Sequence, residues 1–363
     1  MVLAEGGHAT PFALWVVPVS NLGGVARHVL DVASAGIPGY RLVVLCPPGP
    51  LAERLRAVGC PVLTDDFGHD AGVRASIATV RHHLRTLRPA VVHSHLSWAD
   101  VVVAAAVPLR DRPLVVTTEH GIAADDLVYH GTRARSRAKA AMHHLRLRRA
   151  DAAIAVSEST ARVMRAKWHP STPITVIRNG IDRPLEPARR ESGLHIVSIA
   201  RLAPEKRIDA LLDAFAVIAA QRPEARLTIA GEGPLRSEIE ARVDDLGLGD
   251  LVSLPGHVDA PELMRTAHVL AQLSVWENAS YSLLDALVAG LGVVATPVGG
   301  NPEIVPASCL VDADDSSAVA SALIEQGLEP AARPMLDPTW PSVAEMSASI
   351  AALYDEGRRS RGA

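Results

Sequence analysis

The strongest candidate for binding a diphosphate is the segment of residues 200–206, whose sequence is ARLAPEK. It directly follows a predicted strand over residues 194–199, and a predicted helix follows it, so Arg201 and Lys206 share one strand-to-helix loop. A guanidinium offers a planar pair of donors and an ammonium a compact charge, and the two together suit a diphosphate. The alternative is a solvated loop in which Glu205 neutralises one of its neighbours.

Two acidic residues, Glu277 and Asp285, flank a predicted helix start near Ser282. Paired carboxylates can act as general acid and base. Eight helical residues would nevertheless separate the two by about 12 Å along the axis, so we expect them to contact different parts of one long ligand. The segment Ser282-x-x-Asp285 also resembles a capping box with Asp in place of Glu, and spacing alone favours that structural role for Asp285.

Histidines follow two predicted strands, as His93-Ser-His95 and as His120-Gly121. A His-x-His pair with a third histidine can bind a metal. The chain has 15 histidines, however, and no Asp or Cys at ligand spacing joins these three. We therefore predict no metal, and we expect His120 to face the substrate in a cleft between two domains.

The dipeptide Gly23-Gly24 lies just past the first predicted strand and opens a helix. Backbone without side chains lets amide groups approach a phosphate, and a helix N-terminus favours negative charge. A simple tight turn is the alternative.

These candidate residues are positioned by an alternation of short apolar strands and amphipathic helices. Expected strands include residues 12–19, 41–46 and 90–93 in the first half, and residues 194–199 and 226–230 in the second. Such alternation predicts parallel sheets with right-handed crossovers. Two series in one chain predict an α/β protein with two doubly wound domains that face each other.

The predicted boundary falls in residues 178–193, a charged segment with Gly and Pro and no apolar periodicity. We expect a first domain over residues 1–185 and a second over residues 186–335. Residues 341–357 are expected to form a last amphipathic helix.

Composition narrows the function classes. The 363 residues are 48% hydrophobic and 21% charged, as in a globular chain of about two domains. No apolar run reaches the roughly 18 residues of a membrane-spanning helix, and we see no signal peptide. Three cysteines are too few for a disulfide framework, so we expect the cytoplasm.

Charge is divided unevenly along the chain. Residues 1–185 hold 22 Lys and Arg against 14 Asp and Glu, and the remainder holds 14 against 26. Residues 133–149 contain seven Lys or Arg and no acid, so this stretch could contact an anionic acceptor or a membrane surface peripherally. A solvated helix is the favoured alternative. We expect no nucleic-acid partner.

In this order and spacing, nine motifs resemble the glycosyltransferases of family 4, a retaining family with the GT-B fold. The similar segments run from the Gly-Gly loop to the stretch GGNPEIV, and they are Gly23-Gly24, Thr118–Gly121, Ala155–Glu158, Val176–Asp182, Ala200–Lys206, Ala230–Pro234, Gly256–Val258, the acids Glu277 and Asp285, and Gly299–Val305.

The resemblance implies a GT-B fold with a cleft between two Rossmann-like domains and a C-terminal helix that crosses back to the first. It also implies a nucleoside diphosphate sugar donor, with UDP as first guess, a hexose-type sugar, an acceptor hydroxyl and no metal or cofactor. The acceptor would be a small molecule, a glycan or a lipid-linked sugar. The first domain would bind it and the second the donor.

The resemblance also assigns roles to residues. Arg201 and Lys206 would bind the diphosphate, Glu277 the sugar hydroxyls and Asp285 the ribose, with His120 beside the sugar. Other residues implied at the donor are Gly23, Gly24, Gly231, Gly233, His257, Val258, Asn278, Ala279, Ser280 and Tyr281.

One departure bears on donor identity. The family usually has E-G-F-G-L after the first acid, whereas this chain has Glu277-Asn-Ala-Ser-Tyr-Ser, and its second acid is Asp rather than Glu. The altered loop leaves open a catalytically weak nucleotide-sugar-binding protein. A non-hydrolysing nucleotide-sugar epimerase, which has the same fold, is the second alternative.

Overall fold

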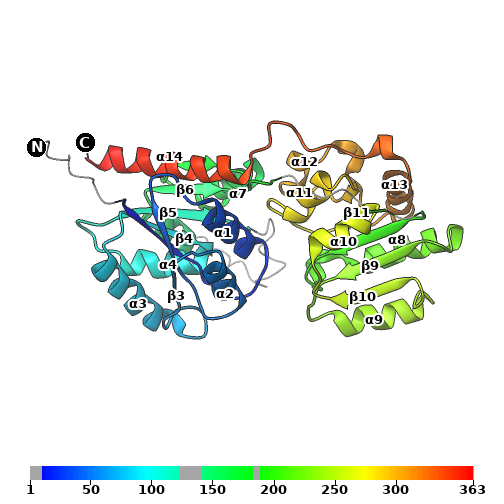
Figure 1. Cartoon of the computed structure of the whole chain (residues 1–363), viewed down its shortest axis with the longest axis horizontal. Helices are drawn as coiled ribbons and strands as arrows, with labels where there is room; N and C mark the ends of the chain where they lie inside the picture. The colour runs from blue at the N-terminus through cyan, green and yellow to red at the C-terminus, as the bar shows by residue number, and fades with distance from the viewer. Residues whose placement is uncertain (1–9, 123–140, 183–188, 191, 363) are drawn as a thin grey trace, which may run out of the picture. The chain divides into compact units, whose positions relative to one another are not determined.

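The computed structural model describes residues 10–122, 141–182, 189–190 and 192–362. The chain divides into two compact units (Figure 1). Unit 1 comprises Met1–Gly180 together with Pro341–Ala363, and unit 2 comprises Ile181–Trp340. Unit 1 is therefore assembled from both ends of the chain.

Unit 1 is built on a seven-stranded parallel sheet with the strand order β3-β2-β1-β4-β5-β6-β7. Its strands are β1 (Phe12–Val16), β2 (Arg41–Leu45), β3 (Val62–Leu63), β4 (Val91–His95), β5 (Leu114–Glu119), β6 (Ala152–Ala155) and β7 (Ile174–Val176). The strand order reverses direction between β1 and β4, and such a switch point is where doubly wound sheets bind ligands.

Helices cover both faces of this sheet. They are α1 (Gly24–Ala35), α2 (Pro50–Ala57), α3 (Gly72–Leu87), α4 (Leu96–Ala106), α7 (Glu158–Trp168) and α14 (Val343–Gly362), and residues 141–147 are also helical. Successive residues of β1 point to opposite faces of the sheet. Trp15 packs with α1, α2 and α14, while Leu14 packs with α3 and α4.

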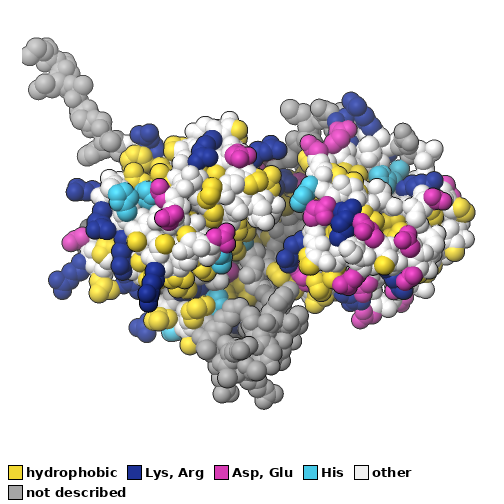
Figure 2. Space-filling view, turned by 90° about the horizontal axis from the view of Figure 1, so that it is seen from below, with side chains coloured by type: hydrophobic (Ala, Val, Ile, Leu, Met, Phe, Trp, Pro, Cys, Tyr) yellow, Lys and Arg dark blue, Asp and Glu magenta, His cyan; other side chains and the backbone are white. Residues whose placement is uncertain are grey.

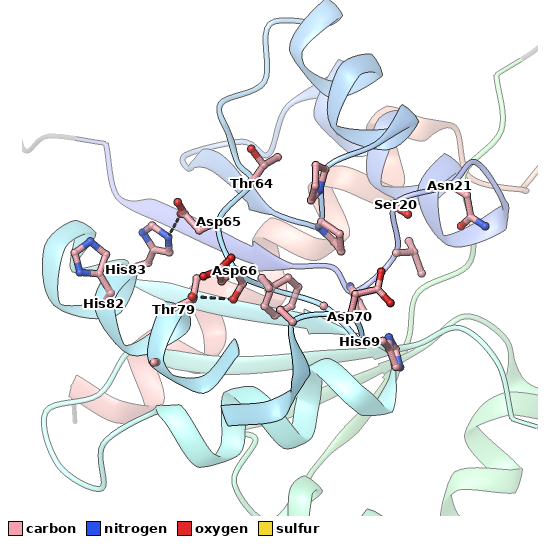
Figure 3. A pocket seen from close by; sticks show the side chains of 18 residues that line it. Ser20, Asn21, Thr64, Asp65, Asp66, His69, Asp70, Thr79, His82 and His83 are labelled. Atoms are coloured by element: carbon pink, nitrogen blue, oxygen red, sulfur yellow. Dashed lines mark hydrogen bonds and ion pairs between the residues drawn. The ribbon is translucent and has the colours of Figure 1, made fainter. Parts of the chain in front are cut away.

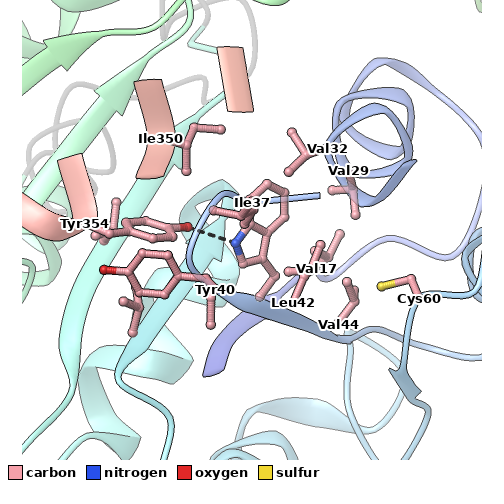
Figure 4. Packing of buried hydrophobic residues seen from close by; sticks show 14 of the residues in the cluster. Val17, Val29, Val32, Ile37, Tyr40, Leu42, Val44, Cys60, Ile350 and Tyr354 are labelled. Carbon is pink, nitrogen blue, oxygen red and sulfur yellow. Dashed lines mark hydrogen bonds between the residues drawn. The ribbon is translucent and has the colours of Figure 1, made fainter. Parts of the chain in front are cut away.

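The last helix, α14, packs on the sheet of unit 1, as predicted. Its residue Ile350 shares a cluster with Val32 of α1, and its Tyr354 ring meets that of Tyr40 edge-on. The Trp15 indole donates a hydrogen bond of 2.9 Å to the Tyr354 hydroxyl (Figure 4). The helix thus completes the layer that α1 and α2 form on this face of the sheet.

Unit 2 has a five-stranded parallel sheet with the order β10-β9-β8-β11-β12. Its strands are β8 (His195–Ile199), β9 (Arg226–Ala230), β10 (Val252–Gly256), β11 (Val269–Gln272) and β12 (Gly292–Ala295). Its helices are α8 (Ile208–Gln221), α9 (Arg236–Asp245), α10 (Ala260–Thr266), α11 (Tyr281–Val288), α12 (Asn301–Ile304) and α13 (Ser316–Leu328), with short 3-10 turns η1 (Pro204–Lys206), η2 (Ala307–Cys309) and η3 (Pro330–Ala332).

One face of this sheet packs against α8, α9 and α13, and the other against α10, α11 and α12. The switch point lies between β8 and β11. The predicted α/β class with two doubly wound, Rossmann-like sheets is therefore confirmed. Four helices, α4, α7, α12 and α13, were not predicted. Within the described residues, no helix combines the length and the apolar character needed to cross a membrane.

Candidate functional site

The loop that carries Arg201 is held against a second loop by close backbone packing. Leu202 N–H donates to the Glu232 carbonyl at 3.0 Å, and Leu235 N–H donates back to Leu202 at 3.1 Å. A Cβ on Gly231, which has φ +134°, would lie 2.0 Å from the Ala200 oxygen. The glycine of this second loop is thus required by the approach of two backbones, whereas the family resemblance implies that the loop frames a nucleotide base.

Lys206 and Glu277 form an ion pair at the switch point of unit 2. Lys206 ends the turn η1 after β8, and Glu277 lies in the loop between β11 and α11, as predicted. Ser274 donates a hydrogen bond of 2.9 Å to the same Glu277 oxygen. Both charged side chains are partly exposed, at 21% and 15%, so a ligand can reach them.

Arg201 lies in the same loop as Lys206, with most of its guanidinium free for a ligand. Its side chain is 65% exposed and donates one hydrogen bond of 2.5 Å to Glu205, which is only 9% exposed. Burial raises the pKa of Glu205, but hydrogen bonds from its own backbone amide and from Arg201 outweigh it, and the pKa is lowered overall. Glu205 therefore neutralises part of the Arg201 charge, as the alternative interpretation of the loop held, and leaves its other donors accessible.

The capping role expected for Ser282 and Asp285 is wrong. Helix α11 begins one residue earlier, at Tyr281, and the Ser280 hydroxyl accepts from the Leu283 amide at 3.3 Å. Asp285 consequently lies beyond the first turn of the helix and takes no part in its N-terminal cap. The shift arises because Ser280 also donates to Gln272 on β11 at 2.6 Å, which fixes it at the helix start.

The remaining expected donor residues of unit 2 fall into two groups. His257 and Val258 follow β10 and are exposed. Asn278 and Tyr281 are 7% and 8% exposed, and Tyr281 belongs to the hydrophobic core, while Ala279 between them is partly exposed. Tyr281 is thus a core residue.

Gly299, which opens the last of the nine motifs, supports Glu277 directly. It has φ +55°, and a Cβ there would lie 1.5 Å from the Glu277 carbonyl oxygen. Only glycine fits this approach.

In unit 1 a chain of hydrogen bonds runs from the last helix to the end of β5. Because the Trp15 indole can only donate, the Tyr354 hydroxyl accepts from it and donates its own proton to His93 Nδ1 at 2.6 Å. His93 then carries its proton on Nε2, which donates to Thr118 Oγ1 at 2.7 Å. Burial holds the pKa of His93 well below its ordinary value, so the ring is neutral.

His120 lies next to this chain, in contact with two other histidines. Its Nε2 shares a hydrogen bond of 2.9 Å with His95 Nδ1. Its ring meets that of His28 edge-on, with 4.8 Å between the two ring centroids. His28 belongs to α1 and was missed from the sequence. The available signal was a histidine on the apolar face of an amphipathic helix, next to Val29.

A buried ion cluster adjoins His120. Arg146, 4% exposed, pairs with both Asp100 and Glu119, and burial lowers its pKa to about 9. The Arg149 side chain also binds within unit 1, because it donates a hydrogen bond of 2.7 Å to the Val107 carbonyl. Two basic residues of the stretch 133–149 thus hold unit 1 together, and residues 133–140 of that stretch lie outside the described part.

Gly23 and Gly24 are exposed at the start of α1. The residues just before them in the sequence reach a cavity of about 980 Å³ in unit 1 (Figure 3). Ser20 and Asn21 line this cavity together with a polar wall, and the main polar side chains of that wall are Asp65, Asp66, His69, Asp70, Thr79, His82 and His83. No Lys or Arg is among the described residues that line it. On the face drawn in Figure 2, Lys and Arg nevertheless gather over unit 1, and Asp and Glu over unit 2.

Comparison with known proteins gives each unit a family. Residues 22–184 match the family described as "Glycosyltransferase Family 4", and residues 193–326 match "Glycosyl transferases group 1". The two matches lie in order and together cover most of the chain. The chain belongs to glycosyltransferase family 4.

Solved glycosyltransferases of similar shape extend over nearly the whole chain. HepE of Anabaena in complex with UDP and glucose is 20% identical, with a TM-score of 0.75 over 96% of this chain and 98% of that one. Sucrose-phosphate synthase of Thermosynechococcus elongatus is 17% identical, with a TM-score of 0.70 over 97% of each. The predicted GT-B fold of this family 4 glycosyltransferase is thereby confirmed.

The curated relatives carry the names of different enzymes. One subunit of human phosphatidylinositol N-acetylglucosaminyltransferase is 24% identical over 80% of this chain, and the match spans 62% of that relative's length. Glycogen synthase of Mycobacterium tuberculosis is 27% identical over 80% of this chain and 78% of the relative. The 2-deoxystreptamine glucosyltransferase of Streptomyces kanamyceticus is 29% identical over 76% and 78%.

Proposed function

We propose that this family 4 glycosyltransferase moves a hexose-type sugar from a nucleoside diphosphate to an acceptor hydroxyl, with retention of anomeric configuration and without a metal ion. UDP is the first nucleotide to test, because HepE is described in complex with UDP and glucose. The observation that carries the proposal is the Lys206–Glu277 pair at the switch point of unit 2, with the exposed Arg201 in the same loop as Lys206. Together they supply two cations for a leaving diphosphate and one carboxylate for sugar hydroxyls.

The chemistry we propose needs no nucleophile from the protein. The bond between the anomeric carbon and the phosphate oxygen breaks, a bond to the acceptor oxygen forms on the same face, and the acceptor proton passes to the leaving phosphate. Arg201 and Lys206 stabilise the charge that develops on that phosphate. No close pair of carboxylates is needed, which agrees with the placement of Glu277 in a loop and of Asp285 in α11.

We propose the remaining contacts to the donor from where each residue lies in the fold. We propose that Asp285, which does not cap its helix, binds the ribose hydroxyls, and that His120 binds the sugar. The backbone at His257 and Val258 would contact the base. Gly231 and Gly233 act indirectly, because they let the Arg201 loop pack closely.

The cavity lined by Ser20 and Asn21, which shortly precede Gly23 and Gly24, is our proposed acceptor site. Its carboxylates favour a neutral polyhydroxylated acceptor or one that carries an amine, rather than the anionic acceptor that the basic first half suggested. Asp66 and Asp70 are exposed in it. A cytoplasmic location is part of the proposal, supported by free, buried thiols at Cys46, Cys60 and Cys309.

The proposal is tested with the full chain, a panel of nucleoside diphosphate sugars and a chelator. We expect slow donor hydrolysis without acceptor, and a product whose anomeric configuration equals that of the donor by NMR. Lys206→Ala and Arg201→Ala should each lower donor turnover by about 10²- to 10³-fold. Arg242→Ala, which removes an exposed ion pair with Asp213 in the same unit, is the control. An isomerised sugar, or binding without turnover, would overturn the proposal in favour of an epimerase or a binding protein.

A further inference from the structure

Three segments of unit 1 bring one histidine each to a common point. His28 comes from α1, His95 from the end of β4 and His120 from just after β5, and one ring nitrogen of each lies within 4.8 Å of the others. His28 and His95 are 1% and 0% exposed, while His120 is partly exposed. The group is therefore enclosed by protein but open on the His120 side.

The hydrogen bond of His28 fixes where its lone pair points. Its Nδ1 meets the Asn179 Oδ1 at 3.2 Å, and because a carbonyl oxygen only accepts, Nδ1 carries the proton and Nε2 carries the lone pair. Nε2 is buried and has no hydrogen-bond partner among the described residues. A histidine that donates one ring N–H to an amide oxygen and aims the other nitrogen into a cluster has the arrangement of a metal ligand with its supporting contact.

His95 presents a second buried nitrogen in need of a partner. Its Nδ1 faces His120 Nε2 at 2.9 Å, while its Nε2 is buried with no partner in the described part of the chain. Burial lowers the pKa of His28 to about 4 and those of His95 and His120 well below their ordinary value, so the rings are neutral at pH 7. Neutral imidazole is the form that ligates metals without releasing a proton.

The neighbouring histidine is excluded from the group by its own contacts. Both ring nitrogens of His93 are used, one by Tyr354 and one by Thr118. The donor set is thus three imidazoles, and metal binding replaces the hydrogen bond between His95 Nδ1 and His120 Nε2.

We propose that His28, His95 and His120 bind one divalent transition-metal ion of the class that prefers imidazole, with Zn²⁺ as the reference, and that the fourth position is left to water. Imidazole nitrogen suits Zn²⁺, Co²⁺ and Ni²⁺, whereas Mg²⁺ and Ca²⁺ require oxygen ligands, which this group does not offer. The site goes beyond the proposed function, because sugar transfer as proposed needs no metal. A metal on His120 occupies the side chain proposed to face the sugar, so bound Zn²⁺ inhibits transfer.

Metal binding is measured on the tag-free full chain after treatment with a chelator and its removal. Calorimetry with Zn²⁺ should give one site per chain, and Co²⁺ should give the intense visible absorption of a four-coordinate ion. Asn179→Leu removes the supporting hydrogen bond and should raise the Zn²⁺ Kd about 10- to 100-fold. His28→Ala should raise it further.

Two controls distinguish Zn²⁺ binding at this site from Zn²⁺ binding by other histidines and from a loss of binding caused by misfolding. His82→Ala alters an exposed histidine of α3 and should leave the Kd unchanged. His120→Ala alters the partly exposed ligand, and its circular dichroism checks that the chain still folds. A Kd that stays within about twofold in both His28→Ala and His120→Ala overturns the proposal, as does an octahedral Co²⁺ spectrum.

The outcome is independent of the proposed activity. The Zn²⁺ Kd is measured without sugar donor, and donor turnover is measured in the presence of chelator. If either experiment contradicts its proposal, the other proposal still stands. Inhibition by Zn²⁺ that persists unchanged in His28→Ala would also count against the site.

Discussion

The Tyr354 hydroxyl donates a hydrogen bond of 2.6 Å to His93 Nδ1, across 261 residues of sequence. The same hydroxyl accepts from the Trp15 indole, so one atom of the last helix satisfies two buried groups of the sheet. The proton positions along this chain follow from donor and acceptor chemistry, and they end at Thr118, two residues before His120.

Tyr354→Phe should destabilise the chain by about 1–3 kcal/mol, because it leaves the Trp15 N–H and the His93 Nδ1 buried without partners. The free energy of unfolding in urea measures this. Tyr40→Phe is the matched control, since the Tyr40 hydroxyl meets Asp355 in a partly exposed setting and its loss should cost about 1 kcal/mol or less. An equal effect of the two changes would show that the Tyr354 hydroxyl contributes no more to stability than a partly exposed one.

Gly299→Ala should reduce stability by about 2–4 kcal/mol and weaken donor binding, because its Cβ would collide with the Glu277 carbonyl at a left-handed φ. Thermal unfolding and UDP calorimetry measure the two effects. Gly249→Ala is the control, because the nearest atom to its Cβ lies 4.0 Å away. A Gly299→Ala protein that binds UDP like wild type would show that this contact does not support Glu277.

Stability should fall as the pH drops below about 6.5, measured with chelator present. Burial lowers the pKa of His28 from 6.5 to about 4, so between these values the unfolded chain binds a proton that the folded chain does not. By linkage the folded state loses up to about 3 kcal/mol from this residue over that window, and nothing above it. Urea titrations at pH 7.5 and 5.5 test this, and His28→Gln should show a smaller difference than wild type. A pH-independent free energy of unfolding is the contrary result.

Asp66→Asn and Asp70→Asn should raise the acceptor KM about tenfold with little change in donor KM, if the cavity of Figure 3 binds an acceptor that carries an amine. Initial rates with amine-bearing and neutral acceptors, each varied against fixed donor, measure the effect. Asp245→Asn, in α9 of unit 2, is the control for a change of one charge. An unchanged acceptor KM in both cavity variants removes this cavity from the proposed site.

The positions of the proposed donor-binding residues in unit 2 were largely predictable from the sequence, because the carboxyl ends of adjacent parallel strands meet at one edge of a sheet. That rule placed Arg201 and Lys206 after β8 and left Glu277 in the loop after β11. It did not predict that Lys206 and Glu277 pair with each other, since 71 residues separate them and their meeting depends on strand order.

Local sequence patterns gave wrong or no predictions where tertiary contacts select one of several locally acceptable structures. Ser280 and Ser282 are both suitable caps, and the contact with Gln272 selects Ser280. Helix α4 is rich in Ala and Val and apolar on most of its surface, so it lacks the periodicity that marks an amphipathic helix. Sequence spacing likewise could not show that Arg146 turns inward to Asp100 and Glu119.

The docking of α14 on unit 1 has a consequence for how the chain matures on the ribosome. Unit 2, Ile181–Trp340, is a continuous stretch and has its full set of residues before α14 is synthesised. Unit 1 is translated first, yet one face of its sheet is only partly covered, by α1 and α2, until Val343–Gly362 emerges. The order of completion is therefore the reverse of the order of synthesis, and a stalled or truncated nascent chain would expose the apolar residues around Trp15 to chaperones.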